Sequence, residues 1–307
     1  MQRVSVLLAT CNSEKYLAEL MDSILDGTYE DIKLYVRDDC SQDETRKIIA
    51  SYDDLRIESA VNPLPSGSAQ NNFFRLLLNS EGDYLMFADA DDVWKPDKVK
   101  RTLAKMQELE RAYGRETPLL VHTDLCVVDE KLEVIAPSMW KYEKLSTQRH
   151  SLKNMLVQNV VTGCTMMVNR ALADMVREQP AECVMHDWWL ALVAAAFGKI
   201  DVVDEPLMLY RQHGSNQVGA YDASNQVKNA KKLADTQRIR KIYESMYGQA
   251  RCFAETYRES LTPEQYALCM EFANQSGRTK IGKMRAIVKN GFYKNTLLRN
   301  IGQFIAV

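Results

Sequence analysis

The chain has 307 residues, of which 46% are hydrophobic and 26% are charged, so it can bury a core of ordinary globular size. Only 13 glycines and 8 prolines are present, which excludes fibrous and low-complexity classes. No apolar run approaches the roughly 18 residues that a membrane span requires, and residues 1–4 lead into a strand-like segment without a signal-peptide pattern. We therefore expect a cytoplasmic globular protein.

The charges are unevenly distributed, although the net charge is only −2. Residues 228–307 carry 15 Lys and Arg against 6 Asp and Glu, or +9, so residues 1–227 carry −11. After Glu271, seven basic residues and no acidic residue follow. An acidic body therefore bears a basic tail. The seven cysteines form no CxxC pair, which predicts neither a disulfide framework nor a zinc ribbon.

Strands and helices alternate in the first half of the chain. Apolar runs rich in β-branched residues predict strands, and apolar residues at helical spacing predict helices. The expected strands are residues 4–9, 32–36, 55–60 and 84–88. The expected helices are one capped by Asn12 or Ser13 and others over residues 43–50 and 71–78. This alternation predicts an open α/β sheet with helices on both faces.

The alternation loosens in the second half. The expected elements are strands over residues 119–122, 125–128, 160–168 and 200–210 and a helix over residues 187–197. After about residue 222 the pattern is helical to the end. We therefore divide the chain into a domain of residues 1–221 and a basic helical extension of residues 222–307.

Two acidic clusters follow predicted strands. Asp38 and Asp39 end one strand, and Asp89, Asp91 and Asp92 end another. Ligands of open α/β sheets bind beyond such strand ends, and carboxylates gathered there repel each other unless a cation lies between them. Mg²⁺ and Mn²⁺ prefer oxygen ligands and often bridge to phosphate. Because the chain lacks GxGxxG and P-loop motifs, a metal bridged to a diphosphate is our interpretation, although turn and cap formation explain the first pair equally well.

Three motifs, in this order, resemble the family-two glycosyltransferases of the GT-A fold. They are Val-Ser-Val-Leu-Leu-Ala-Thr-Cys-Asn at 4–12, Val-Arg-Asp-Asp-Cys-Ser-Gln-Asp-Glu-Thr at 36–45 and Ala-Asp-Ala-Asp-Asp-Val-Trp at 88–94. The resemblance continues through residues 162–164, 186–189 and 210–216 and covers the chain to about residue 220. The groups Asp-Asp-Val-Trp, His-Asp-Trp-Trp and Tyr-Arg-Gln-His-Gly are similar to those of bacterial rhamnosyltransferases that use dTDP-L-rhamnose.

The resemblance implies a GT-A, Rossmann-like open mixed sheet and a function. That function is the metal-dependent, inverting transfer of a sugar from a nucleotide donor to a glycan in cell-surface polysaccharide synthesis. Asp91 and His213 are implied to hold Mn²⁺ or Mg²⁺, and Asp187 is implied to be the base that takes the proton of the acceptor hydroxyl. The residues implied to line the nucleotide pocket are Thr10, Asn12, Asp38, Asp39 and Asp89.

Asp187 precedes two tryptophans at an expected helix start, where the helix dipole favours its anion. An ordinary N-cap aspartate is the alternative. Trp94, Trp188 and Trp189 are candidates for stacking on the acceptor sugar, although core packing is the commoner fate of such residues. Cys40 stands where the family commonly has glycine, and we expect it to preserve the backbone path.

The basic tail has two interpretations, because apolar and basic residues alternate at helical spacing over residues 280–305. One is an interfacial helix on the inner face of the plasma membrane, where enzymes resembling this one extend glycans on polyprenyl-diphosphate lipids. The other is a bundle that packs on the catalytic domain or on a second subunit of a homodimer. The acidic body disfavours nucleic acid as a partner.

Two alternative functions stay open. A family-two transferase could use a UDP-hexose, and a catalytically silent protein of the same fold could bind the nucleotide sugar. The presence of Asp89, Asp91 and Asp187 favours an enzyme. A nucleotidyltransferase would carry a glycine-rich, basic loop after the first strand, which residues 10–13 do not provide.

Overall fold

The computed structural model describes residues 2–214, 219, 220, 222 and 236–306, and it divides into two compact units. The first unit comprises Met1–Met139, Val161–Gln179 and Gly198–Ala220, and the second comprises Trp140–Val160, Pro180–Phe197 and Tyr221–Val307. Ser215 and Asn216 of the last sequence motif lie outside the described residues. The expected functional division at residue 221 stays a prediction.

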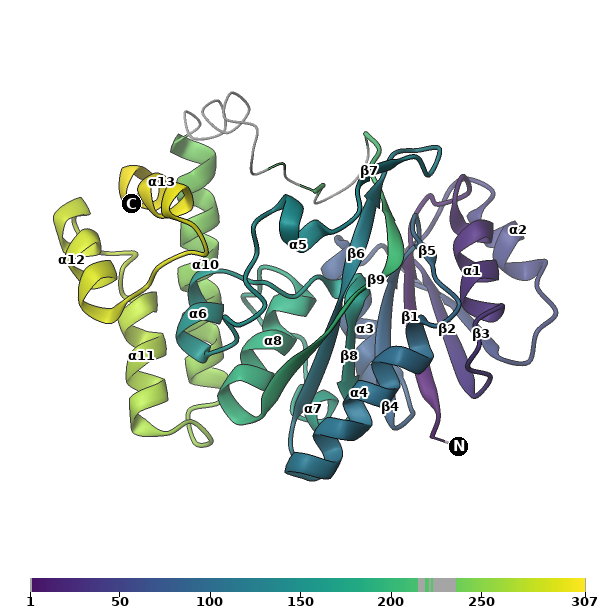
Figure 1. Cartoon of the computed structure of the whole chain (residues 1–307), viewed down its shortest axis with the longest axis horizontal. Coiled ribbons are helices and arrows are strands. Elements are labelled where there is room, and N and C mark those ends of the chain that lie inside the picture. Colours follow the sequence, from purple (N-terminus) through teal and green to yellow (C-terminus); the bar gives the residue numbers. More distant parts are fainter. Residues whose placement is uncertain (1, 215–218, 221, 223–235, 307) are drawn as a thin grey trace. The chain divides into compact units, whose positions relative to one another are not determined.

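The first unit is built on a mixed sheet with the strand order β3-β2-β1-β4-β8-β6-β9-β5, and β7 pairs with β6 (Figure 1). The strands are β1 (Val4–Thr10), β2 (Ile32–Asp38), β3 (Ile57–Val61), β4 (Tyr84–Asp89), β5 (Val93–Trp94), β6 (Leu119–Val128), β7 (Val134–Ala136), β8 (Met166–Asn169) and β9 (Lys199–Arg211). Strands β1 to β4 pair in parallel, β8 is antiparallel to both its neighbours, and β9 is parallel to β6. The expected open mixed sheet is confirmed.

Helices cover both faces of this sheet. They are α1 (Leu17–Leu25), α2 (Thr45–Ala50), α3 (Ala69–Asn79), α4 (Lys98–Tyr113), α7 (Arg170–Ala173) and the 3₁₀ helix η1 (Gly163–Thr165). The neighbouring side chains of Val6 and Leu7 point to opposite faces of β1, and both are fully buried. Helix α3 packs on β1 and β2, whereas α4 packs on β6, β8 and β9.

The strands β1, β2 and β4 end at the same edge of the sheet. In the parallel register, Thr10 lies opposite Asp38, and Ala9 lies opposite Asp89. The acidic clusters that follow β2 and β4 therefore share the carboxyl edge of the sheet, as the sequence predicts.

The second unit is helical in its described part. Its helices are α6 (Leu152–Val157), α8 (His186–Phe197), α10 (Thr236–Thr256), α11 (Pro263–Ala273), α12 (Lys280–Asn290) and α13 (Leu297–Ala306), and it also includes all of α5 (Met139–Tyr142) except Met139, which is counted with the first unit. Helices α10 and α11 pack against each other, and α6 packs on α8 (Figure 1). The helical pattern expected after residue 222 is confirmed over residues 236–306. Among the described helices, none combines the length and hydropathy that crossing a bilayer requires.

Several elements differ from the sequence-based expectation. Residues 119–128 form the single strand β6, because a shift of its register with β9 around Asp124 lets one strand continue across the interruption. The strand expected over residues 160–168 begins only at Met166, after the 3₁₀ turn η1. Neither α4 nor β5 was anticipated. Helix α1 begins at Leu17 without a side-chain cap, and the backbone carbonyl of Ser13 accepts the N–H groups of Tyr16 and Leu17.

Candidate active site

The loops after β1 and β2 each contain a residue in the left-handed region, Asn12 with φ 51° and Cys40 with φ 60°. The N–H of Asn12 donates to Ser41 Oγ at 2.8 Å, and its Oδ1 accepts the N–H of Gln42 at 2.8 Å. Cys40 thus adopts a backbone conformation that glycine would take at a lower steric cost.

Thr10 and Asp38 lie beneath these loops, each only 1% exposed. Thr10 Oγ1 donates to Asp38 Oδ1 at 3.2 Å, and the N–H of Ser41 donates to Asp38 Oδ2 at 3.0 Å. The Asp38 carboxylate is therefore directed at the protein, where it fixes the β2 loop.

Asp39 is half-buried at the edge of the sheet. Its carboxylate accepts the side-chain amide of Asn62 at 2.7 Å and both the N–H and the hydroxyl of Ser66 at 2.6 and 2.7 Å. Burial alone would raise the pKa of Asp39, but these hydrogen bonds outweigh it and hold the pKa below its ordinary value. Asp39 is thus an ionised, fixed acceptor at neutral pH.

The structure brings Asp91 and His213, the two expected metal ligands, into direct contact with each other. The atoms Asp91 Oδ2 and His213 Nε2 are 2.7 Å apart, and their side chains are 24% and 11% exposed. The ring of Tyr16 lies beside the imidazole, with 5.2 Å between the ring centroids. A carboxylate oxygen and an imidazole nitrogen this close together are compatible ligands for one Mn²⁺ or Mg²⁺.

Arg211, the last residue of β9, joins three segments to the loop that carries Asp91. Its guanidinium donates to the backbone carbonyls of Asp91 at 2.8 Å and Glu130 at 2.7 Å, and it pairs with the Glu19 carboxylate on α1. It also stacks 4.4 Å from the centroid of the Tyr16 ring. Its side chain is only 3% exposed, so these partners replace its hydration.

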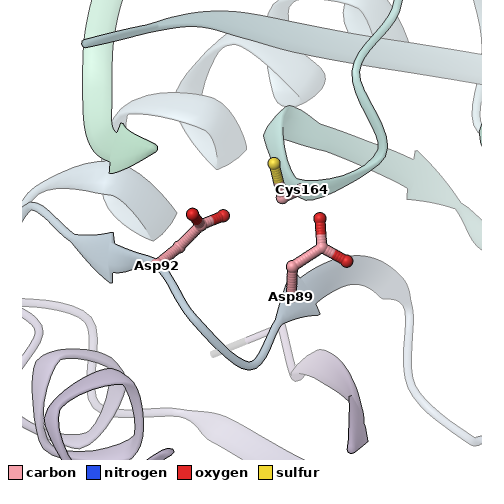
Figure 2. A group of neighbouring side chains, drawn as sticks. All are labelled: Asp89, Asp92 and Cys164. Carbon is pink, nitrogen blue, oxygen red and sulfur yellow. The ribbon is translucent and has the colours of Figure 1, made fainter. Parts of the chain in front are cut away.

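A second cluster lies behind the loop, where Asp89, Asp92 and Cys164 place oxygen and sulfur atoms within 4.8 Å of one another. Figure 2 shows the two carboxylates, at the opposite ends of the loop between β4 and β5, around the thiol of η1. Asp92 is fully buried, and its Oδ1 accepts the N–H of Arg211 at 3.1 Å. Burial, reinforced by the charges of Asp91 and Asp89, raises the pKa of Asp92 well above its ordinary value.

Lys98 supplies a positive charge near this cluster. Its Nζ donates to the carbonyl of Cys164 at 2.6 Å and lies 4.4 Å from the centroid of the Trp94 ring. Burial lowers the pKa of Lys98 to about 8, while Cys164, Asp92 and Asp89 act in the opposite direction. Sequence reasoning gave Lys98 no role, because α4 was not anticipated and a lysine side chain ordinarily lies in solvent.

Asp187 and its neighbours belong to the second unit, in the first turn of α8. Asp187 Oδ1 accepts the N–H of Trp188 at 2.6 Å, and so satisfies a helix-terminal donor. The indole N–H of Trp188 donates to the carbonyl of Met155 at 2.6 Å. His186 is buried, and burial lowers its pKa to about 3, so its ring is neutral at physiological pH.

The structure corrects the expectation that Trp94 and Trp189 stack on an acceptor sugar. Trp94 is 3% exposed and Trp189 is fully buried, so neither offers an open ring face. Trp189 packs edge-on against Phe253 with 5.5 Å between the ring centroids, and also contacts Tyr257. Only Trp188 stays a candidate, because it is partly exposed.

The chain matches the family model described as glycosyl transferase family 2 over residues 5–174. It belongs to this family. The chain is 28% identical over 228 residues to a dTDP-rhamnosyl transferase, RfbG of Shigella flexneri, with 69% of this chain and 74% of the relative covered. It is 30% identical over 199 residues to a putative teichuronic acid biosynthesis glycosyltransferase, TuaG of Bacillus subtilis, with 63% and 73% covered.

Solved structures share the fold. The complex of Staphylococcus aureus TarS residues 1–349 with UDP-GlcNAc aligns with a TM-score of 0.58 at 16% identity, over 99% of this chain and 90% of that one. The Pyrobaculum calidifontis mannosyltransferase with GDP-Man and Mn²⁺ aligns with a TM-score of 0.55 at 15% identity, over 99% and 84%. The family membership and these alignments confirm a glycosyltransferase of GT-A-like fold.

We expect Arg211→Met to lower the free energy of unfolding by about 3 kcal/mol, because it leaves two carbonyls and the loop carboxylates without their buried counter-charge. Urea denaturation measures the loss. Glu19→Gln is the control: this partner is 48% exposed, and its amide oxygen still accepts a hydrogen bond, so its loss should stay below about 1 kcal/mol. Equal, small losses in both variants would show that Arg211 does not hold the loop.

Proposed function

We propose that this glycosyltransferase moves L-rhamnose from dTDP-β-L-rhamnose to a glycan acceptor in cell-surface polysaccharide synthesis. The similarity to the dTDP-rhamnosyl transferase RfbG is the observation that carries the donor. The motif groups at residues 91–94, 186–189 and 210–214 support it. The similarity to TuaG supports a cell-surface product.

The nucleotide would bind along the carboxyl edge of β1, β2 and β4. Asp39 is suited to accept a hydrogen bond from the N3–H group of the pyrimidine, because it is ionised and its position is fixed by Asn62 and Ser66. Asn12 and Asp89 would line the same pocket. Thr10 and Asp38, which are buried, would hold the loops that carry these contacts.

Asp91 and His213 are proposed to hold Mn²⁺ or Mg²⁺. A divalent cation there would stabilise the negative charge of the leaving diphosphate. The contact between Asp91 Oδ2 and His213 Nε2 supports this assignment, because it presents two suitable ligand atoms together. Arg211 would fix the backbone of Asp91 in the position that binding requires.

Asp187 is proposed as the general base. The acceptor oxygen would form a bond to the anomeric carbon as the bond from that carbon to the diphosphate oxygen breaks, and the hydroxyl proton would pass to the Asp187 carboxylate. Attack opposite the leaving group inverts the β-linked donor to an α-linked rhamnoside. The proposed acceptor is a glycan on a polyprenyl-diphosphate lipid, which would place the enzyme at the inner face of the plasma membrane.

The metal assignment predicts that Asp91→Ala abolishes the Mn²⁺ dependence of donor binding, because it removes a hard oxygen ligand. Isothermal calorimetry with dTDP-rhamnose, with and without Mn²⁺, measures this. Asp53→Ala, at an exposed aspartate of the same unit, serves as the control and should behave as the parent does. An Asp91→Ala protein with unchanged affinity and metal dependence would refute the assignment.

The base assignment predicts that Asp187→Asn leaves donor affinity nearly unchanged but lowers the transfer rate by at least about 100-fold. The amide oxygen can still accept the N–H of Trp188, so the start of α8 is preserved. Single-turnover transfer to a soluble acceptor mimic gives the rate. Glu182→Gln, at an exposed carboxylate of the same unit, should transfer at the parent rate. Near-parental turnover of Asp187→Asn would mean that another group takes the proton.

The proposed donor is tested by turnover of purified protein with dTDP-β-L-rhamnose, UDP-glucose, UDP-galactose and GDP-mannose. We expect dTDP-rhamnose to be preferred and NMR of the product to show an α-linked rhamnoside. Preference for a UDP-hexose would show that dTDP-rhamnose is not the donor, and a β-linked product would show that transfer does not invert the anomeric carbon. Donor binding without hydrolysis or transfer in any arm would favour a silent binding protein.

A further inference from the structure

Helices α12 and α13 contribute both to the core of the second unit and to its surface. Ile287 on α12 and Phe292, just beyond it, are at most 1% exposed, so this part of the chain is packed. Lys280 Nζ at the start of α12 donates to the carbonyl of Ile305 on α13 at 2.9 Å, which joins the two helices. The tail is therefore a folded element with a defined outer face.

This outer face carries large apolar side chains beside the exposed cations of α12. Large side chains on α12 and α13 are exposed, including Leu297 at 77%, Ile281 at 64% and Val288 at 60%. We name this set the α12–α13 surface; it comprises Ile281, Met284, Val288, Leu297, Leu298, Ile301 and Ile305. Large exposed apolar side chains on two joined helices are typical of a contact site for a partner or a membrane.

A groove of about 950 Å³ opens beside this surface. Its lining includes Ile281, Met284 and Val288 of α12 and Phe304 of α13, the cationic side chains of Arg285 and Lys289, and the ion pair of Arg278 with Glu271. An apolar groove beside cationic groups fits a molecule with an acyl chain and an anionic headgroup.

The charge of this region distinguishes a lipid surface from a second copy of the chain. Lys280, Arg285 and Lys289 are exposed on α12, and no acidic residue follows Glu271 in the sequence. Two copies that met through this face would bring like charges together, which costs free energy. An anionic leaflet offers the opposite charge to the lysines and arginine and an apolar phase to the leucines and isoleucines.

We propose that the α12–α13 surface binds an anionic phospholipid leaflet, with acyl chains entering the groove. This extends the proposed function, since it names the partner that brings the enzyme to a lipid-linked acceptor. Lipid binding by this surface requires neither the sugar donor nor the transfer reaction. Its binding is measured without donor, acceptor or metal, so its failure is separable from a failure of the proposed reaction.

The test is co-sedimentation of the full-length protein with phosphatidylglycerol vesicles and with phosphatidylcholine vesicles. We expect binding to phosphatidylglycerol at low ionic strength, weakened by salt because the charges are screened. Arg285→Gln with Lys289→Gln should weaken it roughly 25-fold, at about fivefold for each cation lost. Leu297→Ser with Ile301→Ser should weaken it at least about tenfold, through lost apolar insertion.

Matched controls lie in the first unit. Lys100→Gln with Lys131→Gln removes the same charge at exposed positions, and Leu55→Ser replaces a leucine that is 96% exposed. Both should change vesicle binding less than about twofold. All substitutions are on exposed side chains, and equal thermal midpoints would show that the fold is intact.

Three results would overturn the proposal. One is the lack of phosphatidylglycerol binding by the parent, and another is an equal loss in the controls. The third is a parent dimer, seen by light scattering without vesicles, that Leu297→Ser with Ile301→Ser dissociates, because a second copy would then be the occupant.

Discussion

Repulsion between carboxylates gathered at one edge of a sheet is the constraint on which the first unit depends. Asp89, Asp91 and Asp92 lie within four consecutive residues, and partly buried like charges destabilise one another. Two buried cations come from distant parts of the chain. Arg211 reaches the loop from the end of β9, and Lys98 lies behind it at the start of α4. Strand β9 positions Arg211, and the Cys164 carbonyl in η1 holds the Lys98 ammonium group.

The two acidic clusters share a division between inward and outward carboxylates. Asp38 and Asp92 are buried and accept backbone N–H groups, so they hold their loops in place. Asp39 and Asp91 are partly exposed. Each cluster thus has a carboxylate that fixes the loop and one that remains accessible. An accessible carboxylate with a fixed position is what a nucleotide or a cation requires, which connects this part of the fold to the chemistry of the family.

Local sequence patterns predict the features that neighbouring residues determine. The apolar runs of β1, β2 and β4 and the acidic residues at their ends needed no knowledge of distant parts of the chain. The role of Arg211 could not be predicted, because it pairs with Glu19 across 192 positions. The burial of Trp189 likewise depends on α10, which supplies Phe253. The single strand β6 could not be distinguished from two short strands, because the shift at Asp124 depends on its partner β9.

The short loop between β4 and β5 limits how this family member can vary. Both ends of the loop are held in the sheet, since β4 pairs with β1 and β8, and β5 pairs with β9. Only residues 90–92 separate the two strands. An inserted or deleted residue could not be absorbed there without breaking strand pairs. Among descendants of this protein, we therefore expect substitutions of side chains around this loop, and insertions or deletions only in other connections.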